Sequence, residues 1–208
     1  MINLNGELIN EQEQSLTNNR AFLFGDGVFE TIKVLDNKVL FLEDHYFRLM
    51  SSMRILRMKI PMDFTMQYFE NQILETATKN NIGNSARVRI TIFRNVGGLY
   101  LPKDRSISFI VQASPLSNLT YTNNKVTYEV ELYKDFTVTK QLLSTLKTTN
   151  RLINITASIF AEENNYQNCL LMNDSKNIIE TINGNIFMVV GNKITTPPLS
   201  EGCINGIL

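Results

Sequence analysis

The sequence predicts an α+β protein made of two α/β subdomains, and three observations support this fold class. In several stretches polar and apolar residues alternate, which is the period of a strand with one buried face. In others apolar residues recur every three or four positions, the period of an amphipathic helix. Both patterns occur on each side of an uncharged, turn-rich stretch at residues 115–124. We therefore expect a first domain at residues 1–118, a linker at 119–124 and a second domain at 125–208.

In the first half the expected order is a hairpin, a strand turned back on a short partner, two helices and two longer strands. Asn5-Gly6 suits the tight type I′ turn of the first hairpin. Gly25-Asp26-Gly27 forms a turn ahead of the next strand. The predicted ranges are the hairpin at 2–8, strands at 28–35, 38–41, 87–93 and 106–113, and helices at 43–56 and 64–79.

The second half is expected to hold one strand, one helix and then a series of short strands. Asn150 is a candidate N-cap of the helix, because its side chain can accept hydrogen bonds from first-turn N–H groups. Asn-Asp, Asn-Gly and Gly-Asn turns separate the short strands. The predicted ranges are a helix at 150–164 and strands at 125–133, 169–172, 178–180, 185–190 and 193–196.

Composition indicates small-molecule chemistry in a reducing cytoplasm. Twenty basic and twenty acidic side chains cancel, so no net field favours nucleic acid or an anionic membrane surface. Cys169 and Cys203 fit no metal-site spacing, so no metal is expected. The start of the chain lacks the regions of a signal peptide, and the apolar runs are far too short to span a bilayer.

One lysine stands out because its neighbours in QLLSTLKTTNRL are leucines, threonines and an asparagine. An amine held in such surroundings can act as a nucleophile or base. Lys147, Glu180, Arg48 and a glycine turn near the end of the chain are the groups that a pyridoxal phosphate site needs. Taken singly, each has an ordinary explanation: a surface lysine, a strand flank, a solvated helix residue and a turn.

Five motifs in order resemble one family, the class IV aminotransferases, or fold-type IV pyridoxal phosphate enzymes. The resemblance covers nearly the whole chain and implies a D-amino acid aminotransferase-like fold. The motifs are FGDGVFET at 24–31, HYFRL at 45–49, LKTTNRL at 146–152, ETINGNIF at 180–187 and GCINGI at 202–207.

The resemblance implies roles for individual residues around pyridoxal 5'-phosphate. Lys147 would form the Schiff base, Glu180 would keep the ring nitrogen protonated, and Arg48 would bind the phosphate, with His45 in support. The remaining residues assigned to the cofactor are Asn183, Ile204, Gly206 and Ile207.

Within the family, the sequence resembles the 4-amino-4-deoxychorismate lyases most. Thr31 stands where these lyases have a threonine, and LKTTNRL is similar to their lysine motif. The implied reaction expels pyruvate and leaves 4-aminobenzoate, a step of folate biosynthesis in which Thr31 assists protonation. Phe29 and Tyr100 are substrate candidates, and Tyr100 could equally be an ordinary loop aromatic. The alternative is an amino acid transaminase of branched-chain or D-amino acid type.

Relative to the family, the chain is expected to be C-terminally truncated. Related chains usually continue past the glycine turn into a helix and several strands, whereas this sequence ends at Leu208. Either the second domain is completed by unusual means, or the protein is a non-catalytic member that binds the cofactor weakly or not at all. Strand edges at 185–196 favour tight association, and the resemblance implies a homodimer.

Overall fold

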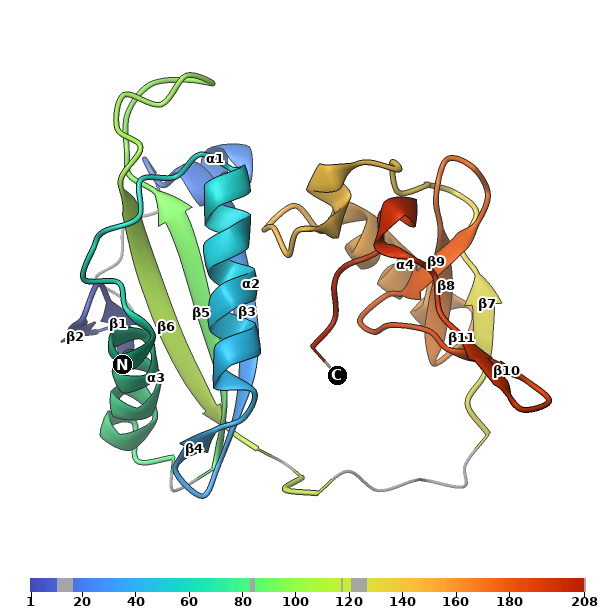
Figure 1. Cartoon of the computed structure of the whole chain (residues 1–208), viewed down its shortest axis with the longest axis horizontal. Helices are drawn as coiled ribbons and strands as arrows, with labels where there is room; N and C mark the ends of the chain where they lie inside the picture. Colours follow the sequence, from blue (N-terminus) through green and yellow to red (C-terminus); the bar gives the residue numbers. More distant parts are fainter. Residues whose placement is uncertain (11–16, 83–84, 117, 121–126, 208) are drawn as a thin grey trace. The chain divides into compact units, whose positions relative to one another are not determined.

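The structure is a computed structural model that describes residues 1–10, 17–82, 85–116, 118–120 and 127–207. Its contacts divide the chain into two compact units, Met1–Thr122 and Asn123–Leu208, which are described separately (Figure 1). The predicted linker at 119–124 lies partly outside the described residues. Within the described part of the chain, no helix is long and apolar enough to cross a membrane.

The first unit is built on a six-stranded sheet with the order β2-β1-β6-β5-β3-β4, in which every neighbouring pair is antiparallel. The predicted hairpin turn at Asn5-Gly6 is confirmed, because both residues have positive φ angles, 52° and 95°, between paired strands. The strands are β1 (Ile2–Leu4), β2 (Glu7–Ile9), β3 (Gly27–Leu35), β4 (Lys38–Val39), β5 (Ala86–Arg94) and β6 (Ile107–Pro115).

Two helices, α2 (Leu42–Ile55) and α3 (Met66–Lys79), cover one face of this sheet (Figure 1). Alternation along the strands sends Val28, Ile32 and Val34 of β3 and their counterparts on β5 into the core beneath the helices. Each fully buried aliphatic side chain contributes about 1.5–3 kcal/mol to folding. The alternate positions of β3, Phe29, Thr31 and Lys33, lie on the other face of the sheet.

A short helix, α1 (Arg20–Phe24), was not predicted from the sequence. The Asn19 side chain caps it by accepting hydrogen bonds from the Ala21 and Phe22 N–H groups, and Gly25 ends it in the left-handed conformation with φ 63°. The predicted turn at Gly25-Asp26-Gly27 is therefore the exit of a helix.

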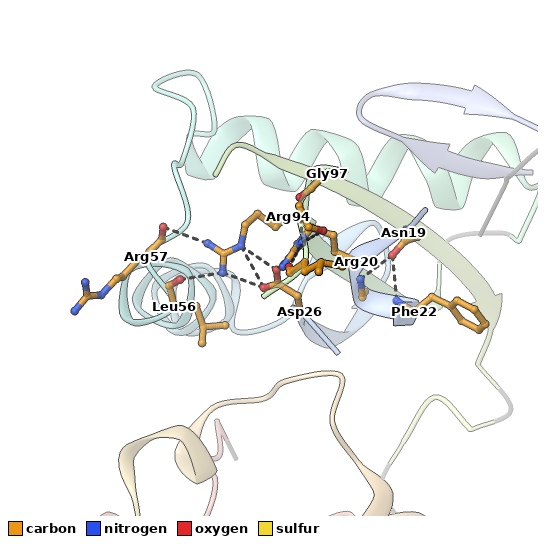
Figure 2. A network of polar contacts seen from close by, with 11 residues as sticks. Asn19, Arg20, Phe22, Asp26, Leu56, Arg57, Arg94 and Gly97 are labelled. Atoms are coloured by element: carbon orange, nitrogen blue, oxygen red, sulfur yellow. Dashed lines mark hydrogen bonds and ion pairs between the residues drawn. The ribbon is translucent and has the colours of Figure 1, made fainter. Parts of the chain in front are cut away.

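Asp26 joins this helix to β5 and to the end of α2 (Figure 2). Its carboxylate accepts from Arg20 Nε at 2.8 Å and from Arg94 Nη2 at 2.9 Å. Arg94 also donates to the backbone carbonyls of Leu56 and Arg57. Burial opposes ionisation, but the hydrogen bonds and charges of the two arginines prevail, so the pKa of Asp26 is lowered.

The second unit contains a three-stranded sheet of order β7-β8-β9, in which β7 and β8 are parallel and β8 and β9 antiparallel. Helix α4 (Leu152–Glu163) packs on it around a core of Tyr133, Ala157, Ala161, Cys169 and Leu171. A separate hairpin pairs β10 with β11. The strands are β7 (Val130–Leu132), β8 (Asn168–Met172), β9 (Ile178–Thr181), β10 (Met188–Val190) and β11 (Lys193–Thr195), and the 3-10 helices are η2 (Leu142–Thr145) and η3 (Leu199–Glu201).

Three details of this unit differ from the prediction. The strand predicted at 125–133 is β7, which begins at Val130 and ends at Leu132; residues 125 and 126 lie outside the described residues. The N-cap of α4 is Arg151 rather than Asn150, because the Arg151 guanidinium holds the preceding turn through its carbonyls and the helix begins one residue later. Strand β10 begins at Met188 rather than Asn185, because its pairing with β11 starts at Met188 and the backbone carbonyl of Ile186 accepts from the Thr196 hydroxyl at 2.7 Å instead.

Candidate active site

Lys147 is the central residue of a three-residue turn between η2 and α4. The Thr148 N–H donates to the Leu146 carbonyl at 2.9 Å, which closes the turn. The Leu146 side chain is buried and anchors the turn in the unit, whereas Lys147 is half-buried. The turn thus presents the lysine side chain from a fixed backbone.

Glu180, on β9, is a buried carboxylate with only 6% of its surface exposed. Its Oε2 accepts a hydrogen bond from the Ile204 backbone N–H at 2.9 Å, while Oε1 accepts none from the described residues. Burial raises the pKa of Glu180, and the Ile204 N–H and the charges of Arg151 and Lys147 oppose this. Because buried polar atoms are normally hydrogen-bonded, Oε1 is available to an N–H donor from a ligand.

A second carboxylate, Glu201, fixes the segment that carries the Ile204 N–H. It accepts hydrogen bonds from Lys140 Nζ at 2.7 Å, Asn173 Nδ2 at 2.7 Å and Asn177 Nδ2 at 2.9 Å. The hydrogen bonds from Lys140, Asn177 and Asn173 lower the pKa of Glu201 to about 2. We did not predict Glu201 from the sequence, where it follows a proline pair in an irregular stretch and carries no recognisable signal.

The other predicted cofactor residues of this unit are spread over two loops. The Ile204 N–H is used by Glu180, and Asn183 Oδ1 accepts from Asn168 Nδ2 at 3.0 Å. Gly206 lies so close to Asn185 that an added Cβ would collide with its Oδ1. Ile207 is half-buried, and the described residues 202–207 form no helix. The backbone at this turn is therefore placed by Asn185 and Glu180.

Arg48 lies in the first unit and is held by a buried glutamate. Its Nε and Nη2 donate to the two carboxylate oxygens of Glu30, and His45 Nδ1 lies 2.8 Å from Glu30 Oε2. His45 therefore supports Arg48 through Glu30. Burial opposes ionisation of Glu30, but the hydrogen bonds and charges of His45 and Arg48 prevail and its pKa is lowered. Glu30 was missed, although a carboxylate at a core-facing strand position is a signal the sequence contains.

The three substrate-side candidates also belong to the first unit. Thr31 pairs with Arg89 of β5 on the face opposite the helices, and the Arg89 guanidinium lies 3.7 Å from the ring centroid of Phe29. Arg89 makes no ion pair with the described residues. Burial of the guanidinium lowers the pKa of Arg89, and the positive charge of Arg87 lowers it further. Tyr100 is 91% exposed on its loop, with its ring centroid 6.0 Å from that of Phe24.

The second unit fits pyridoxal phosphate in part. A lysine on a fixed turn suits the aldehyde, and the open oxygen of buried Glu180 suits a protonated ring nitrogen. The described residues contain no group of three or more histidine, cysteine or acidic side chains placed to hold a metal ion.

Residues 27–208 match the sequence profile of the amino-transferase class IV family, and the chain belongs to that family. This confirms the family that the five motifs resemble. The chain is an enzyme of this family, and class IV aminotransferases use pyridoxal phosphate.

Two curated relatives cover nearly the whole chain. A putative branched-chain-amino-acid aminotransferase of Methanocaldococcus jannaschii is 29% identical over 99% of this chain and 71% of its own length. A D-alanine aminotransferase of Staphylococcus epidermidis is 21% identical over 98% of this chain and 71% of its own.

Solved structures confirm the predicted fold. A branched-chain aminotransferase from Thermoproteus uzoniensis with norvaline has a TM-score of 0.86 and 25% identity, covering 99% of this chain and 70% of its own. A putative 4-amino-4-deoxychorismate lyase from Legionella pneumophila has a TM-score of 0.79 and 23% identity, covering 96% and 72%. A further branched-chain amino acid aminotransferase, complexed with N-(5'-phosphopyridoxyl)-L-glutamate, has a TM-score of 0.85 and 20% identity, covering 99% and 69%.

Proposed function

We propose that the chain is a pyridoxal phosphate enzyme that acts as a 4-amino-4-deoxychorismate lyase, with Lys147 and Glu180 at the centre of its chemistry. The observation that carries the cofactor assignment is the unused Oε1 of Glu180. A carboxylate this buried, with one oxygen hydrogen-bonded and the other open, is a strong acceptor for a charged N–H donor.

When bound, pyridoxal phosphate supplies an aldehyde for the lysine amine and a ring that accepts electrons. Lys147, once its amine is free, removes the proton from the substrate carbon that bears the amino group. Glu180 Oε1 would accept the ring N–H of the cofactor and so would keep that proton in place. Arg48 would bind the phosphate with a planar guanidinium, which lysine does not reproduce.

The lyase outcome needs a proton for the departing group. The bond between the ring carbon and the enolpyruvyl oxygen breaks, and the methylene carbon of the released group takes up a proton to give pyruvate. We assign that proton delivery to the Thr31 hydroxyl. Arg89 supports an anionic substrate, since this guanidinium is stacked over Phe29 and has no carboxylate partner among the described residues. The proposed substrate carries two carboxylates.

A second candidate is transamination of branched-chain amino acids. The similarity to the Methanocaldococcus jannaschii protein and to the Thermoproteus uzoniensis structure favours it. In that reaction Lys147 and Glu180 keep their roles, whereas Thr31 has no proton to deliver.

Product analysis separates the two candidates. We expect the purified protein with pyridoxal phosphate to release pyruvate and 4-aminobenzoate from aminodeoxychorismate, and Lys147→Ala to release neither. Thr31→Val should lower this rate about a hundredfold, within the range for a lost general acid. The matched control is Thr78→Val, at an exposed position of α3, where the hydroxyl donates to the Leu74 carbonyl of the same helix. A keto acid formed from leucine or valine, without pyruvate release, would replace the lyase assignment with the transaminase.

The homodimer, the cytoplasmic location and the folate pathway are parts of the same proposal. The dimer rests on the resemblance of the sequence motifs to the family, and it is tested by light scattering of the eluted protein. A monomeric mass at micromolar concentration would contradict it.

A further inference from the structure

One arginine holds the peptide units on both sides of Lys147. Arg151 Nη2 donates to the Leu146 carbonyl at 2.9 Å, and Arg151 Nε donates to the Thr148 carbonyl at 3.1 Å. The Leu146 carbonyl also accepts the Thr148 N–H that closes the turn. The backbone groups that flank Lys147 thus belong to one hydrogen-bonded cluster centred on this side chain.

These bonds restrain a piece of backbone that no helix or strand restrains. Lys147 lies between η2 and α4, outside the hydrogen-bonding ladders of either. Nε–H and Nη2–H form one edge of a rigid planar guanidinium, so the two carbonyls that accept from it are held at a fixed separation and orientation. Because Arg151 immediately precedes α4, the turn is fastened to the start of that helix.

The charge of Arg151 also acts on the other half of the site. Together with Lys147 it favours the ionised form of Glu180, opposing the effect of burial. The same side chain therefore restrains the backbone of the proposed nucleophile and stabilises the charge of the carboxylate proposed to face the cofactor ring.

We propose that Arg151 is a positioning residue of the active site, which fixes the turn at Lys147 and so sets where the lysine amine lies. The reaction of that amine with an aldehyde rests on the proposed function, whereas the hold on the turn does not. Displacing a reacting group by about 1 Å is enough to slow a reaction about a hundredfold.

The first experiment measures amide hydrogen exchange in the cofactor-free protein. In Arg151→Gln and Arg151→Lys we expect the Thr148 amide to exchange about tenfold faster than in the wild type, because the turn opens locally. Amides of β8 and β9 should keep their rates, which shows that the unit is still folded. The matched control is Lys134→Gln, which removes an exposed positive charge from the same unit. Unchanged exchange at Thr148 in both Arg151 variants would overturn the proposal.

The second experiment measures how fast pyridoxal phosphate is trapped on Lys147 by borohydride, followed as the mass of the Lys147 peptide. We expect the rate to fall about a hundredfold in Arg151→Ala and to be partly restored by millimolar guanidinium ions, which can occupy the vacated position. A variant that is merely less stable would gain nothing from these ions.

The two proposals fail in distinguishable ways. If the wild type forms no adduct at Lys147, the proposed function is wrong, and amide exchange still decides whether Arg151 holds the turn. If all Arg151 variants form the adduct as fast as the wild type, the proposed function stands and the positioning role is wrong.

Discussion

At the scale of single residues, each unit holds a buried glutamate, and the pKa values of the two glutamates move in opposite directions. Glu180 has one hydrogen-bond donor and its pKa is raised, whereas Glu30 has a histidine and an arginine and its pKa is lowered. The sequence allowed Glu180 to be singled out, because it stands at the end of a predicted strand and begins the motif ETINGNIF. Glu30 and Glu201 were not predicted as site residues, because their hydrogen-bond partners are distant in the sequence and are brought together only by the fold.

Replacing Glu180 with glutamine is expected to stabilise the cofactor-free protein at neutral pH. The folded state raises the pKa of this carboxyl, so its contribution to stability is full in acid and is lost as pH rises through the folded-state pKa. The melting temperature of Glu180→Gln should therefore exceed that of the wild type at neutral pH, and the difference should shrink in acid. Glu162→Gln, at an exposed position of α4, is the control. A Glu180→Gln protein less stable than the wild type at neutral pH would contradict this.

Replacing Glu30 with glutamine should have the opposite effect. The variant leaves Arg48 without its bidentate carboxylate partner in a mostly buried position, which costs about 3 kcal/mol. Since the folded state lowers the pKa of Glu30, the stabilisation is present above the unfolded-state pKa and is lost as pH falls through the folded-state value.

Urea unfolding at several pH values checks this, with Glu75→Gln, at an exposed position of α3, as control. Equal stability of Glu30→Gln and the wild type at neutral pH would show that the Glu30–Arg48 ion pair contributes nothing to the free energy of unfolding.

At the scale of elements, alternation and helical period located most strands and helices to within two residues. The predicted helix at 43–56 is α2 (Leu42–Ile55), and the predicted strand at 87–93 is the centre of β5 (Ala86–Arg94). Helix α1 was not predicted, because its five residues are too few to show a helical period. The helix is stabilised by its caps and by the Arg20–Asp26 pair.

The loop after β5 is shaped by the Arg20–Asp26 pair and by two glycines. Arg20 Nη1 donates to the carbonyls of Gly97, Gly98 and Leu99, so the turn ahead of Tyr100 is fastened to α1 (Figure 2). Both glycines have positive φ, but an added Cβ at Gly98 would collide with the Leu101 carbonyl oxygen, whereas at Gly97 its nearest neighbour is the Lys103 side chain at 3.4 Å.

We expect Gly98→Ala to lower stability more than Gly97→Ala. In each variant an alanine with positive φ costs about 1–2 kcal/mol. Gly98→Ala adds a clash with the backbone, and Gly97→Ala does not. Thermal unfolding of the two variants gives the comparison. Equal melting temperatures would mean that the loop relaxes without resistance.

At the scale of the whole molecule, the order of the strands could not be derived from local pattern. In β2-β1-β6-β5-β3-β4 the N-terminal strand pairs with β6, more than a hundred residues later, a contact that periodicity does not encode. The fold followed from the resemblance of five motifs, because their order specifies a family and the family specifies the topology. Both the family and the fold are confirmed by the matches reported above.

The central claim is that Lys147 is the residue that binds pyridoxal phosphate. The most direct test is to incubate the protein with pyridoxal phosphate, reduce it with borohydride and locate the added mass by peptide mass spectrometry. We expect a single modified residue, Lys147. In Lys147→Ala we expect no adduct after reduction and, before reduction, none of the protein-bound visible absorbance of the wild type. An adduct on another lysine, or no adduct at all on folded wild-type protein, would contradict the claim.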